Sequence, residues 1–397
     1  MATPAQRTNT WTLNEWYAQA VAGTTGGYNG SGAGFTWGRN QEGALGINLP
    51  NANDRSSPVQ LPGTWRELSV GLGECSFGTK TNGELWAWGA NEYGQLGQNG
   101  TQNVSSPIQI GTATTWRRIS SYPSGGMATK TDGTLWMWGR NENGVLAQDD
   151  VDVNRSSPIQ IPGTWSDNFE AGGDAMAAVK TDGSLWFWGR NSEGVFGLNS
   201  PSPPNMRRSS PVQLPGTWST TQGAGYISSQ TAGFIKSDGT LWCWGKNDKG
   251  LAGPGGPNKR SSPVQIPGTT WSQIFVGLQQ ALAVKTTGEL YAWGSNSNGM
   301  LAQGPGGDNN QHPTPLQIGT GTDWAEVKGA AGGNVTKSAL KTDGTLWAWG
   351  ENPYGQLDGN EILPAPSGGY SSPKQIPGTN WAQPIKGEYI NGAAHLL

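Results

Sequence analysis

The chain has 397 residues, including 63 Gly, 26 Pro and 21 Trp, and its formal net charge is −3 at pH 7. This composition fits short strands, frequent turns and tryptophan packing better than long helices, and a disordered chain would lack the aromatic residues. The charge balance gives no basic footprint for nucleic acid, and no stretch approaches the roughly eighteen apolar residues of a membrane-spanning helix. We therefore expect no nucleic-acid partner and no insertion into a membrane.

Residues 1–30 are expected to form an N-terminal arm with a short helix. Thr12 has the character of an N-cap, and Glu15 completes a capping box. Apolar side chains follow at helical spacing, namely Leu13, Trp16, Tyr17, Ala20 and Val21. A helix of about ten residues is marginal alone, so we expect docking on the rest of the chain or on a partner, with Trp16 and Tyr17 as contacts. The arm lacks the pattern of a secretory signal, which favours synthesis without export by that route.

A Trp-Gly dipeptide recurs seven times along the chain, at spacings of 51, 50, 50, 56, 49 and 56 residues. Its tryptophans are Trp37, Trp88, Trp138, Trp188, Trp244, Trp293 and Trp349. Each dipeptide is followed by an Asn and a Gly, which tolerate turns well. Such self-similarity indicates a repeat architecture.

Each repeat contains signals for four short strands. Asp132 and Gly133 lie between alternating apolar residues, which is a strong hairpin signal, and related pairs recur in other repeats. A Ser-Ser-Pro segment and a Gly-Thr-Trp-like element end each unit, as in residues 56–65. Proline favours an edge position for that segment. Four strands per unit are the content of a propeller blade.

The two ends of the chain complement each other. The first Trp-Gly lacks the preceding hairpin strand, and residues 392–397 stand where that strand is missing. Pairing of the ends would remove the exposed edges of an open sheet. The sequence therefore predicts an all-β, seven-bladed propeller over residues 31–397, closed by pairing of its N- and C-terminal strands and preceded by the helical arm.

The repeated tryptophans are expected to pack between blades, because residues two apart in a strand share a face. Stacking on a ligand is the less favoured alternative. The chain has two histidines, His312 and His395, which are too few to favour a histidine-based catalytic or metal site. We expect no enzyme activity, no metal and no cofactor. Cys75 and Cys243 occupy different repeat positions, which predicts free thiols.

The hairpin series around Lys130–Trp136 and the run Asn91–Gly97 resemble the regulator of chromosome condensation repeat, over about residues 31–397. The resemblance implies a seven-bladed propeller. The family includes an exchange factor for a small GTPase, a secreted bacterial inhibitor of β-lactamase, and bacterial and bacteriophage proteins of unassigned role. The family repeat often carries a His where this chain has Cys75, Gly125, Ala175, Thr231, Gln280 and Thr336, so exchange activity is not carried over. Residues 261–271 look more like the bacterial and phage versions.

Two sets of residues are candidates for partner binding within the propeller. Arg55, Arg155, Arg208 and Arg260 directly precede Ser-Ser-Pro, and they either form a partial basic ring for an acidic partner or, as the favoured alternative, cover neighbouring tryptophans. Three loops, 199–208, 303–313 and 358–370, are longer than their counterparts. They are either binding loops or insertions that the fold tolerates without a function. Their candidate contacts are Pro203, Asn205, Asp308, Asn309, Pro364 and Tyr370. Asp150, Asp152 and Asn154 have early calcium-loop spacing, but Arg155 replaces the required Gly, which favours a solvated loop.

These features predict a non-enzymatic protein-interaction scaffold. The leading hypothesis is a bacteriophage virion component, such as a tail, fibre or capsid-decorating protein, assembled in the host cytoplasm and docking on virion proteins or on host-surface glycans. One alternative is a cytosolic regulator of a small GTPase or another enzyme. A second alternative is a glycan-binding propeller.

Overall fold

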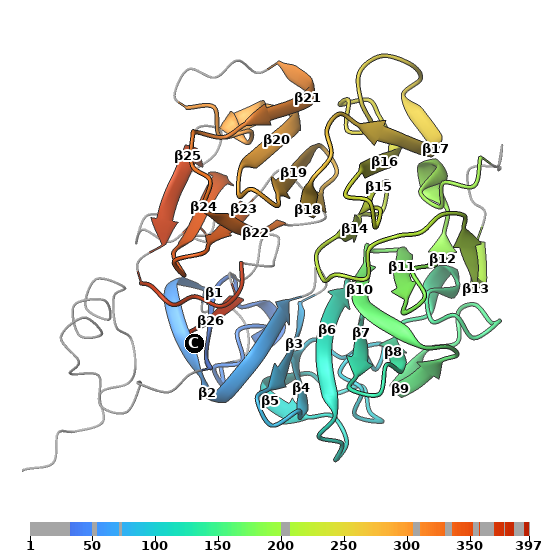
Figure 1. Cartoon of the computed structure of the whole chain (residues 1–397). Helices are drawn as coiled ribbons and strands as arrows, with labels where there is room; N and C mark the ends of the chain where they lie inside the picture. Colours follow the sequence, from blue (N-terminus) through green and yellow to red (C-terminus); the bar gives the residue numbers. More distant parts are fainter. Residues whose placement is uncertain are drawn as a thin grey trace, which may run out of the picture.

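The computed structural model describes residues 32–49, 54–70, 74–199, 207–304, 310–329, 336–351, 357, 369–376, 378–384 and 393–396. These residues form antiparallel sheets arranged in a ring around a central axis, as in a β-propeller (Figure 1). The helical segments within these ranges are four short 3-10 turns. They are η1 (Gln41–Gly43), η2 (Glu142–Gly144), η3 (Ser192–Gly194) and η4 (Ser297–Gly299). No helix among the described residues is long and apolar enough to cross a membrane.

Five sheets have four strands each, in sequence order from the centre outward. One sheet contains β6 (Trp116–Tyr122), β7 (Gly125–Lys130), β8 (Leu135–Gly139) and β9 (Arg155–Ile161). The next sheet contains β10 (Trp165–Ala171), β11 (Ala175–Lys180), β12 (Leu185–Arg190) and β13 (Arg207–Leu214). The third is β14 (Gly225–Ile227), β15 (Thr231–Ile235), β16 (Leu241–Lys246) and β17 (Lys259–Ile266). The fourth sheet contains β18 (Trp271–Val276), β19 (Gln280–Lys285), β20 (Leu290–Ser295) and β21 (Gln311–Gln317). The fifth contains β22 (Trp324–Gly329), β23 (Thr336–Lys341), β24 (Leu346–Glu351) and β25 (Gly369–Ile376).

The sixth sheet has six strands in the order β26-β1-β2-β3-β4-β5. They are β26 (Ala393–Leu396), β1 (Ala33–Gly38), β2 (Arg55–Val70), β3 (Cys75–Lys80), β4 (Leu85–Gly89) and β5 (Val104–Gln109). Strand β2 is continuous over 16 residues. It pairs with β1 along Arg55–Thr64 and with β3 along Trp65–Val70.

The predicted fold class is corrected by this sheet. The described strands form six sheets, so the structure is an all-β, six-bladed propeller and the prediction of seven blades is wrong. The physical reason is that β2 runs without a break from the end of the first sequence repeat into the second, which joins the two in one sheet. The helical arm predicted for residues 1–30 lies outside the described residues, and the described part contains no α-helix.

The predicted pairing of the two ends is confirmed. Strand β26 runs antiparallel to β1, with Ala33 opposite Leu396 and Thr36 opposite Ala393. The C-terminal strand therefore covers the edge of β1 that would otherwise be exposed (Figure 1).

Neighbouring sheets are joined by the tryptophans of the Trp-Gly dipeptides, which are fully buried. For six of them, the indole Nε1 donates a hydrogen bond to a carbonyl in the turn of the preceding repeat. The pairs are Trp88 to Ala44 (2.8 Å), Trp138 to Gln95 (2.9 Å), Trp188 to Val145 (2.7 Å), Trp244 to Val195 (2.6 Å), Trp293 to Leu251 (3.0 Å) and Trp349 to Met300 (3.0 Å). Burial of the ring supplies hydrophobic energy, and the hydrogen bond satisfies its only polar group. The prediction that these rings pack between blades is confirmed.

Candidate functional site

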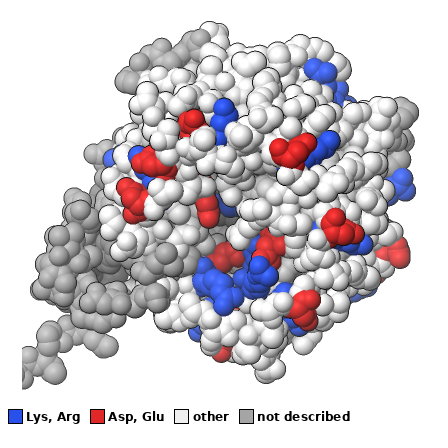
Figure 2. Space-filling model, in the orientation of Figure 1, with Lys and Arg blue, Asp and Glu red and all other residues white. Residues whose placement is uncertain are grey.

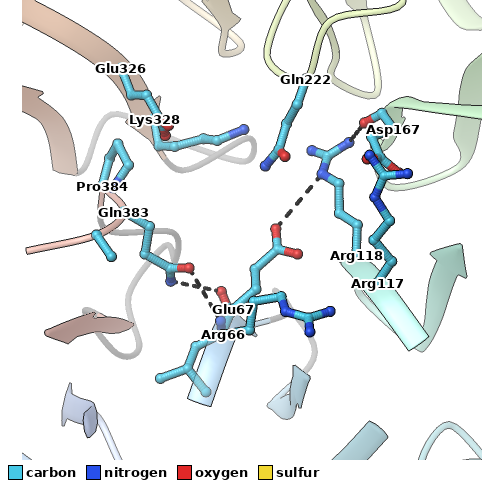
Figure 3. A pocket seen from close by; sticks show the side chains of 12 residues that line it. Arg66, Glu67, Arg117, Arg118, Asp167, Gln222, Glu326, Lys328, Gln383 and Pro384 are labelled. Atoms are coloured by element: carbon cyan, nitrogen blue, oxygen red, sulfur yellow. Dashed lines mark hydrogen bonds and ion pairs between the residues drawn. The ribbon is translucent and has the colours of Figure 1, made fainter. Parts of the chain in front are cut away.

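A cavity of about 410 Å³ opens at the end of the central axis (Figure 3). We call it the axial cup. Its charged lining residues are Arg66, Glu67, Arg117, Arg118, Asp167, Glu326 and Lys328. They come from the inner strands β2, β6, β10 and β22, and the remaining wall includes Gln222 and residues 382–384. The cup lies on the side of the Asp-Gly and Asn-Gly hairpins, because Arg66 donates to the carbonyl of Thr81 in the first of them (3.0 Å).

The cup residues occupy one place in the repeat. Arg66 and Glu67 follow Trp65, Arg117 and Arg118 follow Trp116, and Asp167 comes two residues after Trp165; these tryptophans are buried. The pairing register shifts directly after each of these tryptophans. Such bulges redirect the side chains that follow. The buried Trp therefore anchors the strand, and the bulge allows the next residues to face the axis.

The floor of the cup is an ion-pair network centred on Glu170, whose side chain is 1% exposed. Arg118 Nη2 lies 2.8 Å from Glu170 Oε1, and the Ser120 hydroxyl donates to Oε2 at 2.8 Å. Lys328 on β22 reaches the same Oε1 at 3.3 Å from another sheet. Arg118 also donates to the carbonyls of Phe169 (2.8 Å) and Asp167. A buried carboxylate with three donors is electrostatically satisfied, so these groups hold the inner strands together.

Side chains also join neighbouring inner strands around the axis. Glu67 accepts from the backbone N–H of Ile119 (3.0 Å), and Asn168 donates to the carbonyl of Ser219 (2.7 Å). Gln273 donates to the carbonyl of Gln222 (3.0 Å). Gln383, near the end of the chain, donates to the Leu68 carbonyl (3.1 Å) and accepts from its N–H (3.3 Å). Much of the polar lining is thus committed to holding the ring.

The rim of the cup carries two exposed arginines. Arg66 donates to the carbonyls of Trp116 (3.2 Å) and Thr81 (3.0 Å). Arg117 is 55% exposed, and its Nη2 lies 2.5 Å from Asp167 Oδ2. Figure 2 shows Lys/Arg and Asp/Glu atoms side by side around the hollow near the middle of this face. The rim therefore presents cationic groups that are already held in position.

Glu326 stands in the cup wall near the cations of the floor. Burial raises the pKa of its carboxyl, while the positive charges of Lys328 and Arg118 act in the opposite direction. Desolvation disfavours the charged form of a carboxylic acid, which explains the direction. The Glu326 carboxyl therefore holds its proton more readily than an exposed glutamate does.

A second cavity, of about 760 Å³, lies at the opposite ends of the strands and is lined by Glu42, Glu74, Glu92 and Tyr93 among others. Asn103 donates to Glu42 Oε2 at 2.7 Å, and Arg39 lies 3.9 Å from Glu74. Burial raises the pKa of the Glu74 carboxyl, with Arg39 opposing and Glu42 adding to the shift. This cavity is more open and acidic, in contrast to the mixed charge of the cup.

Three of the four arginines before Ser-Ser-Pro, Arg55, Arg155 and Arg260, contact their own loops instead of tryptophans. Arg155 pairs with Asp150 (2.5 Å) and donates to the Val153 carbonyl (2.8 Å), while Arg260 donates to the Gly255 carbonyl (2.6 Å). Arg55 donates to the Asp54 carbonyl (3.3 Å), and Arg208 is exposed. The structure does not bring these side chains together at one site. Their proposed role in partner binding stays a prediction.

Among the loop candidates, Tyr370 lies within the described residues. It is half-buried, its ring lies 4.4 Å from Lys374 Nζ, and its hydroxyl accepts from that amine at 2.7 Å. The other candidates lie outside the described residues: Trp16, Tyr17, Pro203, Asn205, Asp308, Asn309 and Pro364.

Repeated lysines, and not arginines, stack on the repeated tryptophans. Lys130 Nζ lies 4.7 Å from the Trp116 ring and 4.1 Å from the Trp136 ring. The same arrangement recurs around Lys80, Lys180, Lys236, Lys285 and Lys341, with Tyr291 replacing one Trp. These rings are already covered by the chain's own cations.

The other ionisable groups in the described part of the chain form no metal-binding cluster. The described residues contain no cluster of three His, Cys, Asp or Glu that could hold a metal ion. Both cysteines are free and buried; burial raises the pKa of the Cys75 thiol to about 12 and moves that of Cys243 in the same direction. Asp150 of the calcium-like loop is paired with Arg155.

The fold defines a β-propeller, and segments of its chain match the regulator of chromosome condensation repeat. The family model "Regulator of chromosome condensation (RCC1) repeat" matches residues 82–126, 238–284 and 287–336, and a second model of that description matches 271–299. The E3 ubiquitin-protein ligase HERC2 of Homo sapiens is 30% identical over 81 residues, or 19% of this chain. The match spans 2% of the length of HERC2, and the Mus musculus protein matches equally.

Solved structures share the fold over most of the chain. Human WBSCR16 has a TM-score of 0.76 at 17% identity, covering 92% of this chain and 99% of that one. Saccharomyces cerevisiae Prp20p has a TM-score of 0.72 at 16% identity, covering 92% and 91%. Yeast RCC1 (Prp20), solved with Kap60, has a TM-score of 0.74 at 17% identity, covering 100% and 96%. At these identities the likeness establishes the propeller fold.

Proposed function

We propose that this chain is a protein-interaction propeller that docks a partner protein over the axial cup. The observation that carries the proposal is the rim: Arg66 and Arg117 are exposed beside a cavity, and each is held by contacts within the chain. Two ordered arginines at the mouth of a polar cavity on a rigid ring are suited to binding, because side chains fixed in advance lose little entropy when a partner arrives.

The partners of proteins with a similar structure support a protein ligand. Prp20p is described by its binding to Gsp1p and histones, and yeast RCC1 (Prp20) is bound to Kap60 in its structure. These partners belong to those proteins. For this chain, the shared fold favours a protein ligand over a small substrate, and the pairing of the cup's ionisable groups with one another agrees with binding better than with catalysis.

A cross-linking experiment tests the docking face. A photo-reactive amino acid replaces Gln222 in the cup wall, and a second version carries it at Thr101, which is exposed beside the opposite cavity. In an extract of the chain's native cells, we expect a discrete protein adduct from position 222 and none from position 101. Adducts from position 101 alone would contradict the proposed docking face.

A small GTPase is the more specific partner that the resemblance to RCC1 favours. A panel of small GTPases loaded with a fluorescent guanine nucleotide tests it, because a regulator of exchange would accelerate release. Unchanged release across the panel would remove this alternative without affecting the docking proposal.

A virion location, with virion proteins or host glycans as partners, stays an untested prediction, as does the cytoplasmic alternative. No observation on the described residues favours the virion.

A further inference from the structure

We infer that the axial cup binds the carboxylate of an acidic side chain on a protein partner, through Arg66 and Arg117 at its rim and Arg118 beneath them. This inference rests on the proposed docking function and adds the chemistry of the segment that enters the cup. The residues that carry it come from two adjacent inner strands, β2 and β6 (Figure 3).

The rim arginines keep donors available for a ligand. A guanidinium group has five N–H donors in a fixed plane. Arg66 donates one bond to the carbonyl of Trp116 and one to that of Thr81, which orient the group and leave further N–H groups. Arg117 is 55% exposed and is held on one side by Asp167. A planar fork that is fixed on one side can bind a carboxylate with the other.

Arg118 supplies a buried donor that lacks an acceptor. Its side chain is 3% exposed, and its Nε has no hydrogen-bond partner among the described residues. The nearest carboxylate oxygen, Glu67 Oε1, lies 3.7 Å away, which is too long for a hydrogen bond. The line between these two atoms crosses the cup in Figure 3. A buried donor without a partner is unfavourable, and an entering carboxylate oxygen would satisfy it.

The positive charge that a ligand can meet lies at the rim of the cup. With Glu170 of the floor included, the four cationic residues Arg66, Arg117, Arg118 and Lys328 face the four acidic residues Glu67, Asp167, Glu170 and Glu326. Arg118 and Lys328 are paired with Glu170, whereas the rim carries Arg66, which donates to carbonyl oxygens, and Arg117, which shares the rim with Asp167. A basic segment would meet the two rim arginines first, and the apolar wall, Leu68, Ala382 and Pro384, is small for an apolar anchor. An acidic side chain therefore fits the cup better than a basic or apolar one.

Peptide binding to the full chain tests the inference. The probes are fluorescein-labelled hexaglutamate, hexaglutamine and hexalysine, measured by fluorescence polarisation. We expect hexaglutamate alone to bind, with an affinity that falls as salt rises. In the double variant R66Q/R117Q, we expect the affinity to fall at least about ten-fold. The matched control is Arg190→Gln, because Arg190 is a 39% exposed arginine paired with Asp174 (3.6 Å) outside the cup.

Several results would overturn the inference: no binding of hexaglutamate, equal binding of hexaglutamine, or unchanged binding in R66Q/R117Q. Circular dichroism melting of each variant separates loss of the site from loss of the fold, and Arg117→Lys, which keeps the charge but not the fork, should bind at an intermediate affinity. Free glutamate as a competitor distinguishes a peptide site from a site for small anions. If position 222 cross-links a partner while hexaglutamate fails to bind, the docking function stands and the carboxylate inference fails.

Discussion

Lys328 and Glu170 join inner strands that lie 158 residues apart in the sequence: Lys328 Nζ on β22 lies 3.3 Å from Glu170 Oε1 on β10. Glu170 also receives Arg118 and Ser120. One carboxylate thus links three inner strands of the ring, β6, β10 and β22. This buried group gives the floor of the cup its rigidity.

We expect Glu170→Gln to destabilise the fold by about 3–5 kcal/mol, because it leaves Arg118 and Lys328 as buried cations without their carboxylate. The measurement is the free energy of unfolding in urea. Glu142→Gln is the control, since Glu142 is 48% exposed and its pair with Arg140 (3.1 Å) should contribute at most about 1 kcal/mol. If both variants lose the same free energy of unfolding, the buried Glu170 network stabilises the fold no more than an exposed ion pair does.

We expect Gly94→Ala to be strongly destabilising because Gly94 touches the neighbouring repeat. Its φ is +77°, and a Cβ added there would lie 2.6 Å from the Cβ of Ser156. The backbone strain and the clash together should lower the melting temperature by several degrees. Two glycines separate the causes: Gly111 has φ +60° with open space around it, and Gly100 has neither the positive φ nor a neighbour within 4 Å. We expect the order of damage Gly94, Gly111, Gly100; a harmless Gly94→Ala would contradict the close packing.

These positions show what could be predicted from the sequence. The Trp-Gly spacing and the turn after it predicted the repeats, because a buried indole and a positive-φ glycine are local requirements that recur in each unit. The pairing of β26 with β1 followed from the strand missing before Trp37. The blade count did not follow, because the continuity of β2 through Arg55–Val70 depends on the long-range pairing with β1 and β3, which no local pattern encodes.

The cup was missed for a related reason. Arg66, Arg117 and Arg118 vary from repeat to repeat, so a search for recurring residues passes over them. A usable signal was present: the positions directly after each Gly-Thr-Trp-like tryptophan are charged or polar in several units although they lie in an inner strand. Arg155 and its counterparts recur more regularly, but their guanidinium groups contact local loop atoms, which sequence spacing does not reveal.

We expect the hairpin aspartates to make the fold sensitive to acid. The hydroxyl and N–H of Thr134 hold the pKa of Asp132 below its ordinary value of 3.8, and equivalent contacts act on Asp182, Asp238 and Asp343. A carboxyl with a lowered pKa in the folded state stabilises the fold above its unfolded pKa, and this contribution is lost as pH falls through the folded pKa.

The measurement is the melting temperature between about pH 6 and pH 2.5. Replacing all four aspartates by Asn, which keeps an acceptor oxygen, should flatten the fall at the acid end. Asp248→Asn is the control, since Asp248 lies in a surface pair with Lys246 (3.6 Å) instead of a hairpin. An acid profile that is as steep in the fourfold variant as in the unchanged chain would show that other groups govern the transition.

Removal of residues 393–397 tests the closure of the ring. Without β26, strand β1 loses four paired residues, Ala33 to Thr36, and presents an unpaired edge next to β2. An open edge of this kind can pair with another chain. We therefore expect a lower melting temperature and association that grows with protein concentration, measured by light scattering.

Gln383→Ala is the companion variant, because it removes the two bonds to the Leu68 backbone but leaves the β26–β1 ladder intact. It should lower the melting temperature without causing association, and a truncated chain that melts and remains monomeric like the intact one would contradict a stabilising role for the terminal pairing.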